Sequence, residues 1–359
     1  MRSCRCPQER LRSLEVPFTM EYFAFQFHIT DTCDQRCEHC YIFSEGHPLI
    51  VEMPLDKCTQ VIGKCEDMCH RMGRRPYFYI TGGDPILHRH FWDILSILRD
   101  RNIPFTLMGN PFHLTPEVCR RMKEMGCRKY QLSLDGLRGT HDRIRKPGSY
   151  DATILAMETL REAGLKCAIM STVSGTNIDE MPEVLDVVVR NKADIFAFGR
   201  YCPTSQEKDV HIAPLRYREF LGTMWDKYER YRREGCGTYF NLKDHLWTLF
   251  LYEKGLYRIP GWTKEDVIYD GCNCGNCHFT ITPDGTLMAC RRFTSEVGNI
   301  FKDDPYRVFT EEVERYRDYD RFEKCSRCEL LRFCRGCPAV AYGYTHDFYS
   351  PDPQCWKKV

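Results

Sequence analysis

The segment 22-YFAFQFHITDTCDQRCEHCY-41 decides how this sequence folds. Its first nine residues, Tyr22–Thr30, form an extended, largely apolar run that predicts a buried strand, because aromatic and β-branched residues favour the pleated conformation. Three cysteines, Cys33, Cys37 and Cys40, follow this strand within eight residues. In parallel α/β folds, catalytic groups gather at the carboxyl ends of the strands. The segment therefore predicts a strand that delivers three thiols to the edge of an active site.

This strand is the first of six predicted strands that alternate with amphipathic helices. The other strands are expected over 77–81, 105–108, 130–134, 167–173 and 194–198, and the helical stretches include 54–72, 87–101, 115–125, 150–163, 178–191 and 214–233. Six successive strand–helix units indicate an α/β protein whose parallel sheet is covered by helices, either an open doubly wound sheet or a barrel.

The helix and strand rhythm stops near residue 265, where the density of cysteines rises. We expect an N-terminal tail over 1–20, the α/β barrel over 21–233, a glycine-containing linker over 234–265, and a small domain over 266–359. Metal binding rather than a large apolar core is expected to hold the last domain together.

The chain has 22 cysteines in 359 residues, and its 51 Lys and Arg nearly balance its 50 Asp and Glu. That balance argues against a nucleic-acid partner, because phosphate binding needs a basic surface. No apolar run is long enough for a membrane span, and the N-terminus lacks the apolar core of a signal peptide. We therefore expect a cytoplasmic protein without a membrane partner, in which metal binding explains the cysteines better than disulfides do.

Cys33, Cys37 and Cys40 can hold three corners of one [4Fe–4S] cluster and leave the fourth iron open to another ligand. Structural zinc is the alternative, but it requires four closed ligands and usually pairs two Cys-x2-Cys knuckles. His39 is an awkward fourth ligand because it lies between two of the cysteines. The three cysteines therefore favour a catalytic iron–sulfur site.

The Cys-x3-Cys-x2-Cys run with Tyr41 after it resembles the signature of the radical S-adenosylmethionine (SAM) superfamily. The resemblance implies that Tyr41 contacts the adenine of SAM. It also implies that Gly82, Gly83 and Asp84, in the TGGDP segment after the second strand, hold the methionine amino group. The family carries Glu at the position of Asp84.

A further segment, SLDG followed by HDRIR, resembles the peptide-modifying subgroup of that superfamily. The resemblance implies that Ser133, Asp135 and Arg145 bind SAM, with Ser133 near the ribose and Arg145 on the carboxylate. It also implies the chemistry: one-electron reduction of the cluster cleaves SAM to a 5′-deoxyadenosyl radical, which abstracts hydrogen from the substrate. An electron donor of the flavodoxin or ferredoxin type is then an expected partner.

Nine cysteines between 272 and 355 resemble the SPASM domain, which binds two auxiliary [4Fe–4S] clusters. That pattern assigns Cys325, Cys328, Cys334 and Cys355 to one cluster, and Cys290, Cys337 and two of Cys272, Cys274 and Cys277 to the other. The spacing departs from the family in having two residues instead of three between Cys334 and Cys337. Zinc is again the alternative. The resemblance thus implies three [4Fe–4S] clusters besides SAM.

The ten remaining cysteines are scattered and are expected to pack as small apolar residues. Cys58, Cys65 and Cys69 illustrate this, since their spacing places them on one face of a helix. Cys202 belongs to the same scattered set.

Taken together, these features predict a partial (β/α)6 TIM-like radical SAM barrel with a C-terminal SPASM domain. The segment around the three cysteines resembles maturases of ribosomal peptides with Cys-x-x-x repeats, which form thioethers (ranthipeptides). We therefore expect a peptide maturase acting on a ribosomally synthesised precursor peptide. A carbon–carbon cross-link and formylglycine formation of the anaerobic sulfatase type are alternatives, and Arg291 counts against the latter because that family has an Asp base there. A non-catalytic iron–sulfur electron carrier is disfavoured by the complete set of SAM motifs.

Overall fold

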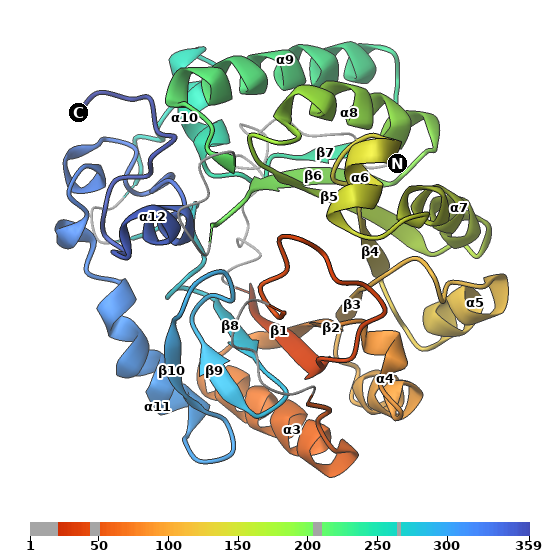
Figure 1. The fold of residues 1–359 in the computed structure, drawn as a ribbon. Helices are drawn as coiled ribbons and strands as arrows, with labels where there is room; N and C mark the ends of the chain where they lie inside the picture. The colour runs from red at the N-terminus through yellow and green to blue at the C-terminus, as the bar shows by residue number, and fades with distance from the viewer. Residues whose placement is uncertain (1–20, 44–50, 204–209, 264–266) are drawn as a thin grey trace.

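The computed structural model describes residues 21–43, 51–203, 210–263 and 267–359 (Figure 1). The expected tail over 1–20 lies outside these residues. The strands are β1 (Tyr22–Thr30), β2 (Arg75–Gly82), β3 (Phe105–Met108), β4 (Lys129–Ser133), β5 (Lys166–Val173), β6 (Ile195–Arg200), β7 (Tyr239–Asn241), β8 (His278–Ile281), β9 (Thr286–Met288) and β10 (Glu296–Asn299). The helices are α3 (Leu55–Arg71), α4 (Phe91–Asp100), α5 (Pro116–Glu124), α6 (Arg138–Ile144), α7 (Ser149–Glu162), α8 (Met181–Arg190), α9 (Pro214–Arg233), α10 (Leu246–Glu253), α11 (Pro305–Thr310) and α12 (Pro338–Thr345).

One ten-stranded sheet runs through the described residues in the order β10-β9-β8-β1-β2-β3-β4-β5-β6-β7. Strands β1 to β7 are parallel neighbours, and β7 and β10 are its two edges, so the barrel is open on one side. Figure 1 shows helices α3 to α9 around the outside of the curved sheet. The predicted α/β partial barrel is confirmed. None of the described helices combines the length and apolar character that a membrane crossing requires.

Successive side chains of β1 point alternately to the apolar core under the helices and to the interior of the barrel. Phe23, Phe25 and Phe27 are fully buried on the helix side, where the Phe25 ring stacks on Phe78 of β2 with centroids 5.3 Å apart. Gln26 and His28 point the other way, because successive side chains of a strand face opposite sides. The predicted cysteine stripe on α3 is confirmed as part of this core.

The stretch expected as a linker, 234–265, contains β7 and α10. β7 pairs in parallel with β6, and Trp247 of α10 packs against Phe198 with ring centroids 5.8 Å apart. This part of the chain therefore extends the barrel rather than merely connecting two domains. The sequence did not predict β7, because three residues are too few to show the alternation that identifies a strand.

The C-terminal cysteine region shares the sheet with the barrel. β8 pairs in parallel with β1, and the antiparallel strands β9 and β10 continue beyond it. At the other end of the barrel, the buried guanidinium of Arg200 bonds to Asp244 (2.9 Å) and to Asp352 (2.7 Å). These contacts join the C-terminal segment to β6.

Candidate active site

Cys33, Cys37 and Cys40 lie in the loop that follows β1, at the C-terminal edge of the sheet. The amide of Cys40 donates to the carbonyl of Cys37 (3.0 Å), and Cys33 Sγ accepts from the amide of Gln35 (3.4 Å) and Nδ2 of Asn110 (3.3 Å). Burial raises the pKa of Cys37 to about 11, and the nearby thiols of Cys40 and Cys33 add to the rise. A cysteine binds a metal as a thiolate, so metal binding displaces the proton of each thiol. Three thiols grouped in this way therefore fit a cluster site.

Gly82 and Gly83 let the end of β2 lie directly against the loop that carries Cys33, Cys37 and Cys40, which we call the thiol loop. Gly82 has a φ of 140°, and a Cβ there would lie 2.1 Å from the carbonyl oxygen of Thr30. A Cβ at Gly83 would lie 2.2 Å from the carbonyl oxygen of Thr32. Only glycine fits either position without moving the backbone of the loop.

Asp84 is fully buried, and neither of its carboxylate oxygens has a hydrogen-bond partner among the described residues. Burial raises its pKa to about 7 and the carboxylate of Asp34 raises it further, while the amides of Asn110 and Ile86, which lie nearby without reaching hydrogen-bond geometry, oppose part of the rise. An unpartnered buried carboxylate is costly unless a donor or cation satisfies it. Its place between Gly83 and Asn110, beside the thiol loop, fits the amino group of a bound methionine moiety.

Arg145 borders the thiol loop from the end of α6. Its Nε donates to Asp135 Oδ2 (2.6 Å), and its Nη1 lies 3.7 Å from Cys37 Sγ. Although burial opposes ionisation, Arg145 and His39 hold the pKa of Asp135 below its usual range, and Asp135 Oδ1 accepts from the amide of Thr172 (2.7 Å). The structure therefore brings Asp135 and Arg145 to the thiols, with the half-buried Ser133 at the end of β4 on the strand just before them.

Tyr41 faces the interior of the barrel. Its hydroxyl accepts from Gln26 Nε2 (3.2 Å), and the guanidinium of Arg291 lies 4.9 Å from the centroid of its ring. The adenine contact implied for Tyr41 stays a prediction.

Basic side chains that sequence reasoning missed line the interior. His28 of β1 has Arg291, after β9, and His278 of β8 as its charged neighbours, and His278 in turn has Lys243, after β7. Burial together with Lys243 lowers the pKa of His278 to about 4, whereas the side chain of Lys243 itself is exposed. Alternation along β1 and β8 marks the two histidines, but the other bases lie in loops that carry no pattern.

The C-terminal thiols form two groups. Cys325, Cys328, Cys334 and Cys355 perturb one another's ionisation and form one group. Cys272, Cys274, Cys290 and Cys337 form the other, which we call the barrel-side thiol group. Four thiols at each place match the ligand number of a [4Fe–4S] cluster.

Cys277 stands apart from both groups. Burial raises its pKa to about 11, and its charged neighbours are Arg74, Arg335 and Asp270, with no other described cysteine among them. Cys202, by contrast, comes from the scattered set, donates its thiol to the carbonyl of Arg200 (3.9 Å) and lies close enough to Cys337 for the two thiols to influence one another's ionisation. Sequence could not reveal this proximity, because Cys202 is two residues past a strand and far from Cys337 in the chain.

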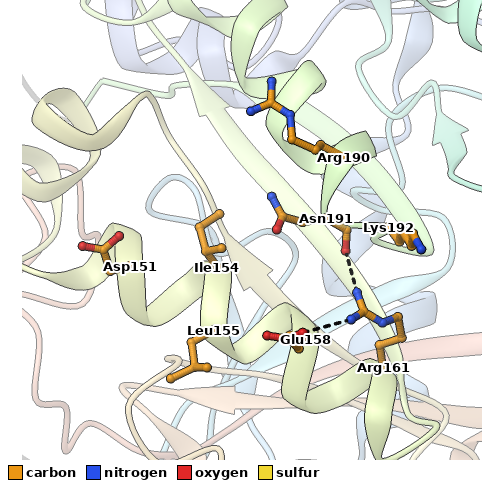
Figure 2. Close-up of a pocket in the computed structure, with 8 residues that line it drawn as sticks. All are labelled: Asp151, Ile154, Leu155, Glu158, Arg161, Arg190, Asn191 and Lys192. Atoms are coloured by element: carbon orange, nitrogen blue, oxygen red, sulfur yellow. Dashed lines mark hydrogen bonds and ion pairs between the residues drawn. The ribbon is translucent and has the colours of Figure 1, made fainter.

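The hollow of about 440 Å³ in Figure 2 lies elsewhere, on the outer surface between α7 and α8. Charged side chains line it, including Arg161, which bonds to Glu158 (3.3 Å) and to the carbonyl of Asn191 (3.3 Å). None of the residues that line the hollow is a candidate site residue, so the hollow is separate from the candidate site.

Comparison with known families agrees with this geometry. The family model described as the Radical SAM superfamily matches residues 27–188, and the SPASM model, described as an iron–sulfur cluster-binding domain, matches 272–338. The protein is a radical SAM enzyme. It is 25% identical to the AdoMet-dependent heme synthase of Nitratidesulfovibrio vulgaris over 91% of this chain and 90% of that protein. It is also 25% identical to mycofactocin maturase MftC of Mycolicibacterium smegmatis, over 96% of this chain and 84% of the relative.

Solved structures share the fold of this radical SAM enzyme. Streptococcus suis SuiB bound to the precursor peptide SuiA superposes with a TM-score of 0.74 at 18% identity, covering 94% of this chain and 76% of SuiB. The structure of anSMEcpe with bound AdoMet and Cp18Cys peptide gives a TM-score of 0.71 at 18% identity, covering 93% of each chain. The predicted architecture, a radical SAM partial barrel with a C-terminal SPASM domain, is therefore confirmed.

Proposed function

We propose that this enzyme is a peptide maturase that oxidatively installs thioether links between a cysteine sulfur and a carbon in a ribosomally synthesised precursor peptide. One observation carries the proposal. The barrel-side thiol group lies against the end of β6, where the carboxylate of Asp352 accepts from both Arg200 (2.7 Å) and the amide of Cys337 (2.7 Å), and Arg292 lies 3.2 Å from the Cβ position of Gly199. A cluster held by the barrel-side thiol group would thus lie next to the barrel interior, which the SAM site also faces, and could oxidise the substrate there.

The residues at the mouth of the barrel have separate roles in this proposal. Cys33, Cys37 and Cys40 would hold the first cluster, Asp84 would accept from the methionine amino group, and Arg145 would meet the methionine carboxylate. When bound, the reduced cluster and SAM supply a 5′-deoxyadenosyl radical that takes a hydrogen atom from the substrate. The loop and the buried barrel wall keep water away from that reactive species.

A thioether link removes one hydrogen atom from the carbon, one proton from the thiol and one further electron. Burial lowers the pKa of His28 and of His278, so both rings are neutral near pH 7 but are weak bases, and neither is assigned the proton. The auxiliary thiol groups suit the electron, since iron–sulfur clusters are one-electron acceptors.

Peptide substrates are supported by relatives of the same architecture. SuiB has been solved with a precursor peptide, and anSMEcpe with the Cp18Cys peptide. Formylglycine formation is the weaker alternative, because the residue after Cys290 is Arg291, whose guanidinium lies over Tyr41 and accepts no proton.

The test is a reaction of the reconstituted enzyme with SAM, a flavodoxin-type reductant and a precursor peptide with Cys-x-x-x repeats taken from a neighbouring reading frame. We expect each link to remove two hydrogen atoms and one alkylatable thiol from the peptide. Loss of hydrogen with every thiol still alkylatable would indicate a carbon–carbon link instead.

A second candidate substrate is a tetrapyrrole with carboxylate side chains. Relatives named AdoMet-dependent heme synthase cover 91% of this chain, and the bases Lys243 and Arg291 inside the barrel are suited to bind propionates. Incubation of the enzyme with iron coproporphyrin III in parallel with the peptide distinguishes the two, since only the true substrate would lose hydrogen or a carboxyl group.

A further inference from the structure

Arg291 follows β9 and lies over the ring of Tyr41 inside the barrel. Its guanidinium lies 4.9 Å from the centroid of that ring, and its Nη1 lies 3.9 Å from Met288 Sδ. Its Nε is buried and has no hydrogen-bond acceptor among the described residues. A guanidinium presents its N–H donors in a planar fork that matches a carboxylate. Stacking on Tyr41 therefore explains where Arg291 lies but leaves a buried donor unsatisfied.

The inward-facing side chains of β1 continue this polar surface. Gln26 Nε2 donates to the hydroxyl of Tyr41 (3.2 Å) and lies 3.1 Å from His28 Nε2. His28 is fully buried, its Nδ1 has no partner among the described residues, and Arg291 is one of its charged neighbours. Buried polar atoms without partners are costly unless a ligand satisfies them, so this surface has the character of a binding site.

Positive charge extends from Arg291 to the wall formed by β5 and β6. Nη2 of Arg292 lies 3.2 Å from the Cβ position of Gly199, and Met170 Cε lies 3.3 Å from the same position. Nζ of Lys243 lies 3.9 Å from Met170 Sδ, and the side chain of Lys243 is exposed. These cations therefore face one stretch of the barrel interior.

The carboxylates of the candidate site lie along a different part of the sheet. Asp84 follows β2 and Asp135 follows β4, both on the far side of β1 from β9. Asp135 is neutralised by Arg145 (2.6 Å), and Asp84 is reserved for the methionine amino group in the proposed function. The interior is thus acidic on one side and basic on the other, so an anionic group of a substrate is favoured beside Arg291.

We propose that Arg291 binds a carboxylate of the substrate, and that the carbon linked to sulfur in the precursor peptide belongs to an aspartate or glutamate residue. This inference rests on the proposed function and names the acceptor residue for it. Tyr41 directly follows Cys40 in the chain. A carboxylate held at Arg291 would therefore lie beside the thiol loop, and the C–H bond next to it would face the SAM site.

The reaction balances for such a residue. The carbon next to the carboxylate loses one hydrogen atom to the 5′-deoxyadenosyl radical, which becomes 5′-deoxyadenosine. The substrate thiol gives its proton to solvent and forms the C–S bond, and the remaining electron passes to an auxiliary cluster of the proposed function. The carboxylate is unchanged by these steps, so it can stay on Arg291 from substrate to product.

The test measures whether Arg291 and the acidic residue depend on each other. The fluorescein-labelled precursor peptide with Cys-x-x-x repeats is titrated with the reconstituted enzyme and SAM, alongside a version whose Asp and Glu residues are replaced by Asn and Gln. Arg291→Gln should weaken binding of the acidic peptide about tenfold and leave binding of the amide peptide unchanged, because both changes remove the same charge-assisted hydrogen bonds. Arg291→Lys keeps the charge without the fork and should recover part of the affinity.

Arg75→Gln is the matched control. The guanidinium of Arg75 also lies over a tyrosine ring, 5.4 Å from the centroid of Tyr22, but at the start of β2, the opposite end of that strand from the thiol loop. It should bind both peptides like the unmodified enzyme. Iron content is measured for every variant, so that a misassembled protein is not mistaken for a weakened site.

Mass spectrometry of the cross-linked peptide then locates each link. Links on acidic residues support the inference. A link on the carbon of a non-acidic residue, or an equal loss of affinity for both peptides in Arg291→Gln, would overturn it and leave the proposed function standing. Conversion of iron coproporphyrin III with no conversion of either peptide would overturn the proposed function, and the acidic acceptor with it.

Discussion

At the scale of single residues, the candidate site is defined by groups that lack partners. Asp84 is buried with two unpartnered oxygens, whereas Asp135, equally buried, is held by Arg145 and the amide of Thr172. A folded protein keeps an uncompensated carboxylate only where something else satisfies it. Asp84 is therefore the residue that would bind a ligand, whereas Asp135 positions Arg145 beside the thiols.

Asp84→Asn should weaken SAM binding about tenfold or more, because a charge-assisted hydrogen bond is lost. Since the pKa of Asp84 is raised to about 7, its ionised fraction falls as the pH falls through 7. SAM affinity of the unmodified enzyme should therefore drop below pH 7, by at most about tenfold per pH unit, while the variant loses this dependence. Equilibrium dialysis with labelled SAM at pH 6, 7 and 8 measures both effects. If the Asp84→Asn variant kept the pH dependence of the parent enzyme, Asp84 would be ruled out as the group responsible.

At the scale of elements, the C-terminal edges of β1 and β2 form the site through contact of their backbones. Sequence predicted the bounds of β1, β3 and α9 to the residue; β1 and α9 are long and strongly patterned, and β3 is a short apolar run between turn residues. It missed β7, which is too short, and the approach of Cys202 to Cys337, which depends on how the end of β6 meets α12. It placed the three cysteines after the first strand and the glycine pair at the end of the second, whereas Lys243 and Arg291 lie in loops that carry no pattern.

Gly83→Ala should disrupt the first cluster and spare the others. The added Cβ would lie 2.2 Å from the carbonyl oxygen of Thr32 and push the thiol loop away from β2. We expect iron analysis to show a loss of about four irons out of about twelve, together with loss of reductive SAM cleavage. Gly139→Ala on α6 is the control, since no atom lies within 4 Å of its Cβ position. Full iron content in Gly83→Ala would mean that the loop tolerates the displacement.

The loop from Cys272 to Cys277 supplies a second test at this scale. Cys274 lies with Cys290 and Cys337, whereas Cys277 has only Arg74, Arg335 and Asp270 as charged neighbours. Cys274→Ala should therefore lose about four irons, and Cys277→Ala should keep all of them. The opposite result, with iron lost only on replacing Cys277, would require the loop to rearrange when the cluster forms.

At the scale of the whole molecule, a buried ion-pair network joins the barrel to the C-terminal cysteine region, in addition to the pairing of β1 with β8. Arg200 of β6 bonds to Asp244, to Asp352 and to Gln354 Oε1 (2.8 Å), and it is almost completely buried. Asp352 in turn holds the backbone of Cys337. The network thus connects the strand that borders the substrate space to a thiol of the barrel-side group.

Arg200→Met should be strongly destabilising, because it keeps the volume of the side chain but leaves two carboxylates buried without their cation. Removing one partner of a buried ion pair costs about 3–5 kcal/mol of unfolding free energy. Arg216→Met is the control, since Arg216 pairs with Asp179 at 2.7 Å on the surface and such pairs contribute about 0–1 kcal/mol. Denaturant unfolding followed by tryptophan fluorescence measures the difference. Because the network also positions Cys337, the Arg200 variant should release iron from the barrel-side group before the barrel unfolds. Simultaneous loss of both signals would instead show that barrel and cysteine region unfold as one cooperative unit.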